Sequence, residues 1–84
     1  MKFVWDERKR QANLLKHGLD FAALDIDFFN RALILSGHSG RLRATGWHDG
    51  QLMIAVIFQP LGSQAISVIS MRPADFKERR LVDA

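Results

Sequence analysis

Several charged side chains lie close together near residue 75, directly after a run of apolar and β-branched residues. Guanidinium groups bind phosphate oxygens through paired hydrogen bonds, and they offset the negative charge that develops in a phosphoryl transition state. A carboxylate in the same place can move a proton. The segment 69–80, "ISMRPADFKERR", therefore predicts either a site that handles phosphate or the solvated start of a basic helix. The residues on which this choice depends are Arg72, Lys77, Glu78, Arg79 and Arg80.

Glu78 has two interpretations. Asp75 precedes it by three residues, which is the spacing of a capping box, where each side chain accepts a hydrogen bond from the other residue's backbone amide. Pro73 disfavours helical geometry at Arg72, so a helix is expected to start near residue 75. A capping role is compatible with a catalytic one, and the sequence leaves both open.

A second group of polar side chains follows helical spacing near residue 13. Lys9, Asn13 and then Lys16 or His17 recur on one face of a predicted helix. His17 stands immediately before Gly18, where the C-terminal end of a helix favours a protonated imidazole. The stripe predicts a phosphate-binding face, although a face that is merely solvated has the same pattern.

Arginines also alternate along a predicted strand. Arg41 and Arg43 share one face through the two-residue period of a strand, and Arg72 ends the last predicted strand, so the three can converge on one sheet surface. Cleavage of RNA by its own 2′-hydroxyl needs a base, an acid and cations around the phosphate, but no metal. The chain has no cysteine, and no histidine and aspartate lie three or four residues apart on one predicted helix, as metal ligands would. We predict no metal and no cofactor.

The elements that must hold these side chains follow from periodicity and turn signals. Helices are predicted at residues 7–17, 21–29 and 75–82, and strands at 3–5, 31–36, 41–48, 51–59 and 65–70. Asp49-Gly50 is a strong hairpin signal, and the apolar run 52–58 predicts a central strand. The predicted fold is α+β in a single domain, 1–84. It has two N-terminal helices, an antiparallel sheet of about four strands plus a short first strand, and a short C-terminal helix.

Composition adds limits to this prediction. The 84 residues carry a net charge of +3, with basic residues on both sides of an acidic segment at 19–30. That distribution permits a nucleic acid or an acidic protein as partner. No apolar run approaches the length that spans a bilayer, and the lack of cysteine fits a reducing compartment. A cytoplasmic location without membrane contact is therefore expected.

Two motifs resemble those of the BrnT family, the toxin half of the BrnT/BrnA type II toxin–antitoxin systems. The opening "FVWDERKRQANLLKHGLDF" resembles the family's aromatic-x-Trp-Asp start followed by Lys, Asn, Lys-His-Gly and Phe. The segment at 69–80 resembles its Ile-Ser-Ala-Arg-x-Ala…Glu-Arg motif, although Met71 and Pro73 flank the arginine differently. The matching residues are Phe3, Trp5, Asp6, Lys9, Asn13, Lys16, His17, Gly18, Phe21, Ile69, Ser70, Arg72, Ala74, Glu78 and Arg79.

The resemblance implies a RelE-like fold and a ribosome-independent endoribonuclease that arrests translation. It also implies neutralisation by a BrnA-like ribbon-helix-helix antitoxin in an assembly of two toxins and two antitoxins, which would meet DNA only through the antitoxin. Full or attenuated activity is left open, and the alternative is a non-catalytic module that keeps the fold and binds protein or RNA. The predicted catalytic residues are Arg72, Glu78, Arg79 and His17, and the predicted RNA-binding residues are Lys9, Lys16, Arg41, Arg43 and Arg80.

Overall fold

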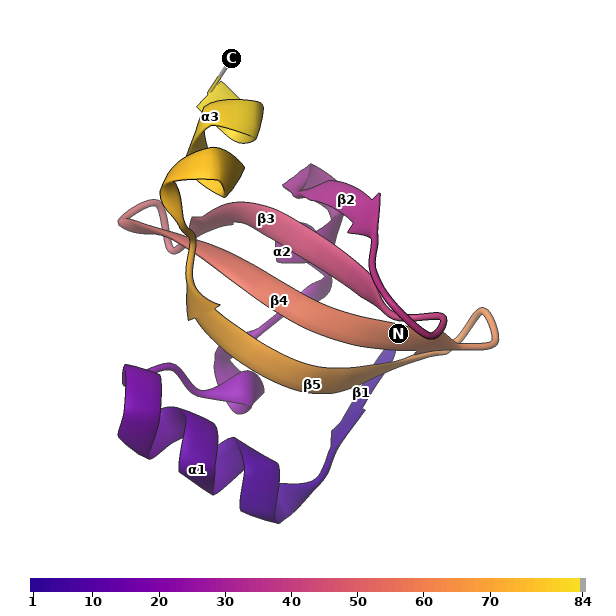
Figure 1. Cartoon of the computed structure of the whole chain (residues 1–84). Coiled ribbons are helices and arrows are strands. Elements are labelled where there is room, and N and C mark those ends of the chain that lie inside the picture. Colours follow the sequence, from indigo (N-terminus) through magenta and orange to yellow (C-terminus); the bar gives the residue numbers. More distant parts are fainter. Residues whose placement is uncertain (84) are drawn as a thin grey trace.

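The chain folds into one five-stranded sheet with helices on both sides. The computed structural model describes residues 1–83. Figure 1 shows α1 below β5, α2 behind β3 and β4, and α3 above the sheet. The elements are β1 (Lys2–Trp5), α1 (Glu7–His17), the 3₁₀ helix η1 (Phe21–Ala23), α2 (Ile26–Arg31), β2 (Leu33–Ser36), β3 (Leu42–His48), β4 (Leu52–Leu61), β5 (Ala65–Pro73) and α3 (Phe76–Asp83).

The first helix has the bounds that the sequence predicts. The Asp6 carboxylate accepts hydrogen bonds from the backbone amides of Arg8 and Lys9, which satisfies free donors of the first turn. Gly18 ends the helix in the left-handed conformation, with φ at 70°, and its amide donates to the carbonyl of Leu14. The prediction of a helix at residues 7–17 is confirmed.

The prediction of one continuous helix at residues 21–29 is wrong. The chain instead forms η1, leaves helical geometry at Leu24, and starts again as α2, which ends at Arg31. The break follows from a second cap, because the Asp25 side chain accepts a hydrogen bond from the amide of Phe28. An aspartate that caps a helix start competes with continuation of the helix before it.

The sheet has the order β1-β5-β4-β3-β2. From β2 to β5, each strand pairs antiparallel with the next one along the chain, and β4 lies in the centre of the sheet, as predicted. The β3–β4 hairpin turns at Asp49 and Gly50, whose φ values of 54° and 68° are those of the turn that the sequence predicts. The expectation of an antiparallel sheet fails at β1, which pairs parallel with β5, Phe3 opposite Ile66. The sheet is therefore mixed.

A bulge decides which side chains of β5 face the helices. Ile57 pairs with Ser70 but the next residue of β4 pairs with Val68, so β5 carries one extra residue between them. The extra residue resets the alternation, and Val68 and Met71 both enter the core. Ser70 and Arg72 consequently point to the opposite face, which we call the open face.

The core lies between one face of the sheet and the segment that runs from Leu19 through η1 and α2. Phe21, Ile54, Val56 and Met71 are fully buried there. Phe29 packs edge-on against Phe28 and Phe58 and stacks on Phe3. Burying such side chains contributes roughly 1.5–3 kcal/mol each relative to exposure. This packing makes the sheet a rigid support for the open face.

Candidate active site

Arg72, on β5, is held in place by Glu78 of α3. Nη1 of Arg72 donates to Oε1 of Glu78 at 2.7 Å, and Nη2 donates to Oε2 at 2.9 Å. Nη1 also lies 3.3 Å from the carbonyl of Pro73. Paired hydrogen bonds of this kind fix the plane of a guanidinium. Arg72 therefore has a defined orientation on the open face.

Glu78 is buried and fully engaged. Only 2 % of the residue is exposed, and its Oε1 accepts a hydrogen bond from the amide of Asp75 at 2.9 Å. The amide of Glu78 donates in return to Oδ1 of Asp75 at 2.8 Å, so the predicted capping box is confirmed. Hydrogen bonds from the Arg72 guanidinium lower the pKa of the Glu78 carboxyl, and the pKa of Arg72 is raised by the same bonds. The pair is ionised at neutral pH.

A second arginine meets the same carboxylate. Nε of Arg43, on β3, lies 3.2 Å from Oε2 of Glu78 as an ion pair, although this buried nitrogen forms no hydrogen bond of good geometry. One carboxylate from α3 thus joins side chains from β3 and β5. Glu78 is the point at which α3 is attached to the open face.

A hollow of about 330 Å³ separates Arg72 from α1. We call it the α1 hollow; its lining includes Lys9, Lys16 and His17 together with Ser70 and Arg72. The predicted basic stripe of the first helix is therefore brought beside Arg72. These groups offer cations and an imidazole on one side of a phosphate held at Arg72.

Asn13 fixes α1 in this position. Its side chain accepts a hydrogen bond from the amide of Met71 at 3.0 Å and donates to the carbonyl of Leu19 at 3.1 Å. The amide of Met71 lies on the part of β5 beyond its pairing with β1, which ends at Val68. Asn13 therefore takes the place of a strand partner and aligns the helix with β5.

A second hollow, of about 250 Å³, opens on the other side of Arg72. We call it the Arg41 hollow; Arg41, Arg43, Arg72 and His38 line it above Ile57. Arg41 and Arg43 thus lie on the same face as Arg72, as their alternation predicts. The sequence gives no signal for His38, because a lone histidine in a glycine-rich loop has no spacing that indicates a role.

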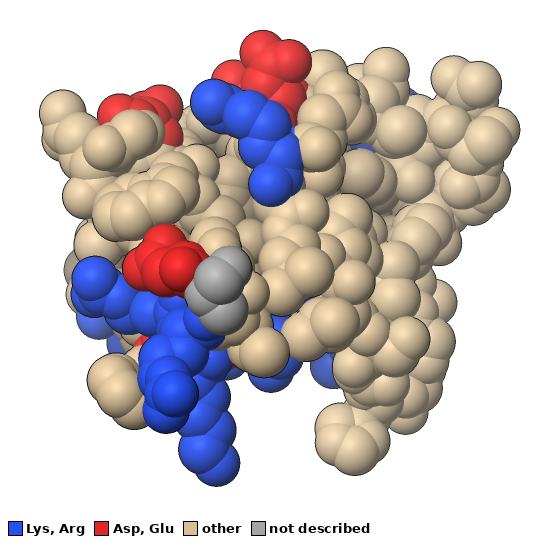
Figure 2. All heavy atoms as spheres, turned by 90° about the horizontal axis from the view of Figure 1, so that it is seen from above, with Lys and Arg blue, Asp and Glu red and all other residues tan. Residues whose placement is uncertain are grey.

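Arg79 and Arg80 lie apart from both hollows. They line a separate hollow of about 440 Å³ with Ala74, Phe76 and Asp83, and the Arg80 guanidinium lies 5.7 Å from the centre of the Phe76 ring. Figure 2, which views the molecule from above, shows a cluster of Lys and Arg side chains beside the end of α3. These two arginines are not lining residues of either hollow around Arg72.

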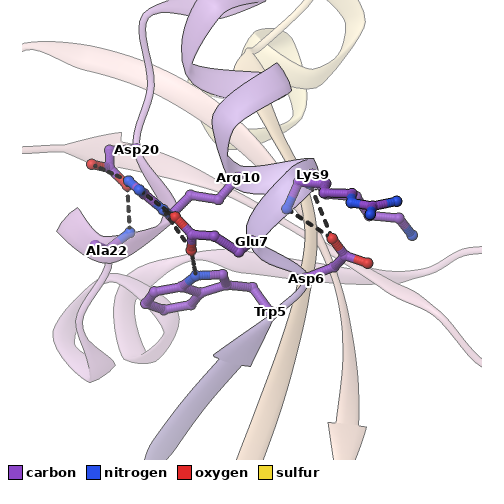
Figure 3. Close-up of polar contacts among 8 residues, drawn as sticks. Trp5, Asp6, Glu7, Lys9, Arg10, Asp20 and Ala22 are labelled. Carbon is purple, nitrogen blue, oxygen red and sulfur yellow. Dashed lines mark hydrogen bonds and ion pairs between the residues drawn. The ribbon is translucent and has the colours of Figure 1, made fainter.

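A further arginine is occupied in holding the start of α1. Figure 3 shows Arg10 between the carboxylates of Glu7 and Asp20, with the Trp5 indole donating to Glu7. These hydrogen bonds, those from Arg10 first, lower the pKa of Glu7 to about 2. The network ties α1 to the start of η1 and leaves Lys9 and Lys16 as the basic groups of α1 that face Arg72.

Two absences can be stated for the part of the chain that the structure describes. Among residues 1–83, no three side chains of the metal-binding types gather closely enough to hold an ion. Within the same residues, no helix is long and apolar enough to cross a bilayer.

Comparison with known proteins assigns the chain to a family. The family model for the ribonuclease toxin BrnT of type II toxin–antitoxin systems matches residues 5–78. The chain belongs to the BrnT family. It is also similar to the crystal structure of the Brucella abortus ribonuclease toxin BrnT, with 55 % sequence identity and a TM-score of 0.85 over 89 % of this chain and 97 % of that one. A search of curated proteins matches none.

The family assignment confirms the resemblance of the two sequence motifs. Both motifs contribute to one place, because the first supplies the α1 hollow and the second supplies Arg72 and Glu78. As a member of this family the chain is a ribonuclease toxin of a type II toxin–antitoxin system, which implies an antitoxin as partner.

Proposed function

We propose that this BrnT-family chain is an endoribonuclease that cleaves RNA at Arg72 without a metal ion, and that this cleavage arrests translation in the cytoplasm. The observation that supports the site is the position of Arg72. Buried Glu78 fixes it from one side, and both basic hollows open beside it. A guanidinium fixed in this way binds the phosphate without reorganising as charge develops.

The chemistry follows from the RNA itself. The 2′-hydroxyl oxygen attacks the adjacent phosphorus, the bond to the 5′-oxygen breaks, and a cyclic phosphate and a 5′-hydroxyl remain. One proton leaves the 2′-oxygen and one is delivered to the 5′-oxygen. His17 is the proton-transfer group that we place in the α1 hollow, with Lys16 and Lys9 contacting RNA phosphates.

Glu78 positions other side chains in this proposal and does not take the catalytic role that the sequence left open for it. Its carboxylate already accepts hydrogen bonds from Arg72 and from the amide of Asp75, and its pKa is lowered by the first of these. A group so engaged is a weak base and is reached poorly by solvent. We assign it the positioning of Arg72 and Arg43, and Arg79 a supporting place on α3 outside the reaction.

Cleavage in excess EDTA is the test. Purified chain incubated with RNA and EDTA should yield fragments with 5′-hydroxyl ends, and Arg72→Ala should yield almost none. RNA that is bound but left intact would instead indicate the non-catalytic module. Cleavage that EDTA abolishes and Mg²⁺ restores would contradict metal independence.

The antitoxin is proposed to be a ribbon-helix-helix protein of the BrnA type that covers the open face. Its dimerisation would give an assembly of two toxins and two antitoxins, which meets DNA through the antitoxin. A partner with acidic side chains would complement the three arginines of the Arg41 hollow. Co-expression with the neighbouring gene should yield a complex containing two copies of this chain, without RNA cleavage, and recovery of free monomer would count against the proposal.

A further inference from the structure

The Arg41 hollow extends from Arg72 toward the loop between β2 and β3. We propose that this hollow binds the phosphate of a nucleotide next to the cleaved linkage, so that the substrate is single-stranded RNA of several nucleotides. The inference rests on the proposed function, because it takes the cleaved phosphate to lie at Arg72.

Arg41 and Arg72 reach the hollow from well-separated points of the backbone, which leaves room at Arg41 for a second phosphate beside the one at Arg72. Arg43 and Ser70 are aligned across β4. Arg41 precedes Arg43 by two residues and Arg72 follows Ser70 by two, so four residues and two strand spacings separate them, about 16 Å between Cα atoms. Glu78 holds both terminal nitrogens of Arg72, which prevents it from swinging toward Arg41.

The lining of the hollow suits an anion. Three arginines line it, none of its lining residues is acidic, and the nearby Glu78 is already paired. Arg41 is exposed and forms no ion pair with any residue in the range 1–83. Arginine binds phosphate bidentately, and Ile57 adds an apolar floor on which a ribose or base can lie.

The loop between β2 and β3 positions the side chains of His38 and Arg41 at the edge of the hollow. The amide of Gly37 donates to the carbonyl of Arg41 at 2.8 Å, and the amide of Arg41 donates to the carbonyl of His38 at 3.1 Å. Ser39 and Gly40 between them have φ values of 59° and 75°, which close the tight turn. Arg41 and His38 are therefore presented together by a hydrogen-bonded turn, and a phosphate can bind with little ordering of the backbone.

Binding of uncleavable oligonucleotides of two lengths tests the proposal. Fluorescent 2′-O-methyl RNAs of two and eight nucleotides lack the attacking hydroxyl. Arg41→Ala should weaken binding of the octamer about tenfold and leave the dinucleotide unchanged, because only the octamer has a second phosphate that can contact Arg41. For the octamer, the slope of the logarithm of the binding constant against the logarithm of the salt concentration should fall in magnitude by about one. Arg31→Ala is the matched control, since Arg31 lies on α2, which packs into the core on the other face of the sheet.

Cleavage of matched substrates separates this inference from the proposed function. With one ribonucleotide in a 2′-deoxy dinucleotide or octamer, Arg41→Ala should lower kcat/KM on the octamer alone, while Arg72→Ala lowers it on both. Equal losses on both lengths, or on neither, would overturn the inference. So would a variant that binds RNA normally but no longer retains the co-expressed antitoxin. If wild-type protein binds the octamer more tightly than the dinucleotide but cleaves neither substrate, only the proposed function is contradicted.

Discussion

Both terminal nitrogens of Arg72 are bonded to the two carboxylate oxygens of Glu78, six residues further along the chain, at 2.7 and 2.9 Å. The contact crosses from a strand to a helix on the other side of a proline. It makes the stability of α3 and the orientation of the Arg72 guanidinium dependent on one ion pair. Changes at either residue should therefore affect stability and cleavage together.

Arg72→Ala should lower cleavage by about 10²–10³ because it removes a charged donor that acts in the transition state. From the sequence alone, a side chain at a strand end is expected to matter little for folding. The structure changes this expectation, since the variant leaves the buried Glu78 carboxylate with only Arg43 and the Asp75 amide of the partners described above. The Arg72 side chain is 32 % exposed, so a loss of about 1–3 kcal/mol in the free energy of unfolding is expected. Urea unfolding and rates per folded molecule measure the two effects.

Glu78→Gln distinguishes a positioning role from proton transfer. Glutamine can still accept the hydrogen bond from Asp75, so the cap survives, but it cannot anchor two guanidinium groups. Misplacement of Arg72 should slow cleavage by up to about 10²-fold while the pH–rate profile keeps its shape. Loss of one limb of that profile would identify Glu78 as a proton carrier. Glu78→Ala should lower stability further, by about 0.5–2 kcal/mol for the lost cap.

Acid should remove the contribution of Glu78 to stability. Its pKa in the folded chain lies below the ordinary value of 4.5, so its stabilising effect is complete above that value and is lost as the pH falls through the lowered pKa. The difference in unfolding free energy between wild type and Glu78→Gln should be constant near neutral pH and shrink below about 4.5. Glu7 and Asp20, which also have lowered pKa values, cancel in this difference. A difference that grows on acidification would refute the assignment.

Asn13→Ala should lower stability by about 1–3 kcal/mol, because the amide of Met71 loses its partner. Cleavage should fall as well, since Lys16 and His17 are no longer aligned with β5. Leu15→Ala on the same helix is the control, because Leu15 is 90 % exposed. Thermal unfolding and RNA cleavage at a temperature where both variants are folded give the comparison. Unchanged cleavage by folded Asn13→Ala would remove α1 from the site.

Local signals account for most of the fold that the sequence predicts correctly. The caps at Asp6 and Gly18 bound α1, and Asp49-Gly50 sets the central hairpin. The parallel pairing of β1 with β5 has no such signal, because parallel neighbours are joined through distant parts of the chain. The break in the second predicted helix did have a local signal, because Asp25 can cap a helix start. The helical spacing of the apolar residues around Asp25 favoured one continuous helix instead.

The candidate site was predictable in its residue types more than in its grouping. The alternation of Arg41 and Arg43 correctly indicated the face that they share with Arg72, and helical spacing grouped Lys9 with His17. Proximity in sequence was misleading for Arg79. It follows Glu78 directly, yet helix geometry turns it away, into a different hollow. Catalytic and RNA-binding roles for these residues stay predictions.

The hydrogen bond between Asn13 and Met71 joins residues 58 positions apart. The pairing of β1 with β5 likewise joins distant parts of the chain. Contacts this distant form late, because the intervening chain must first be ordered. During synthesis, α1 cannot dock until β5 has left the ribosome, so Lys16 and His17 have no Arg72 to face in a shorter nascent chain. Stalled chains that stop before β5 should therefore be protease-sensitive and leave RNA intact. The proposed site should thus gain its ribonuclease activity only once β5 has emerged from the ribosome.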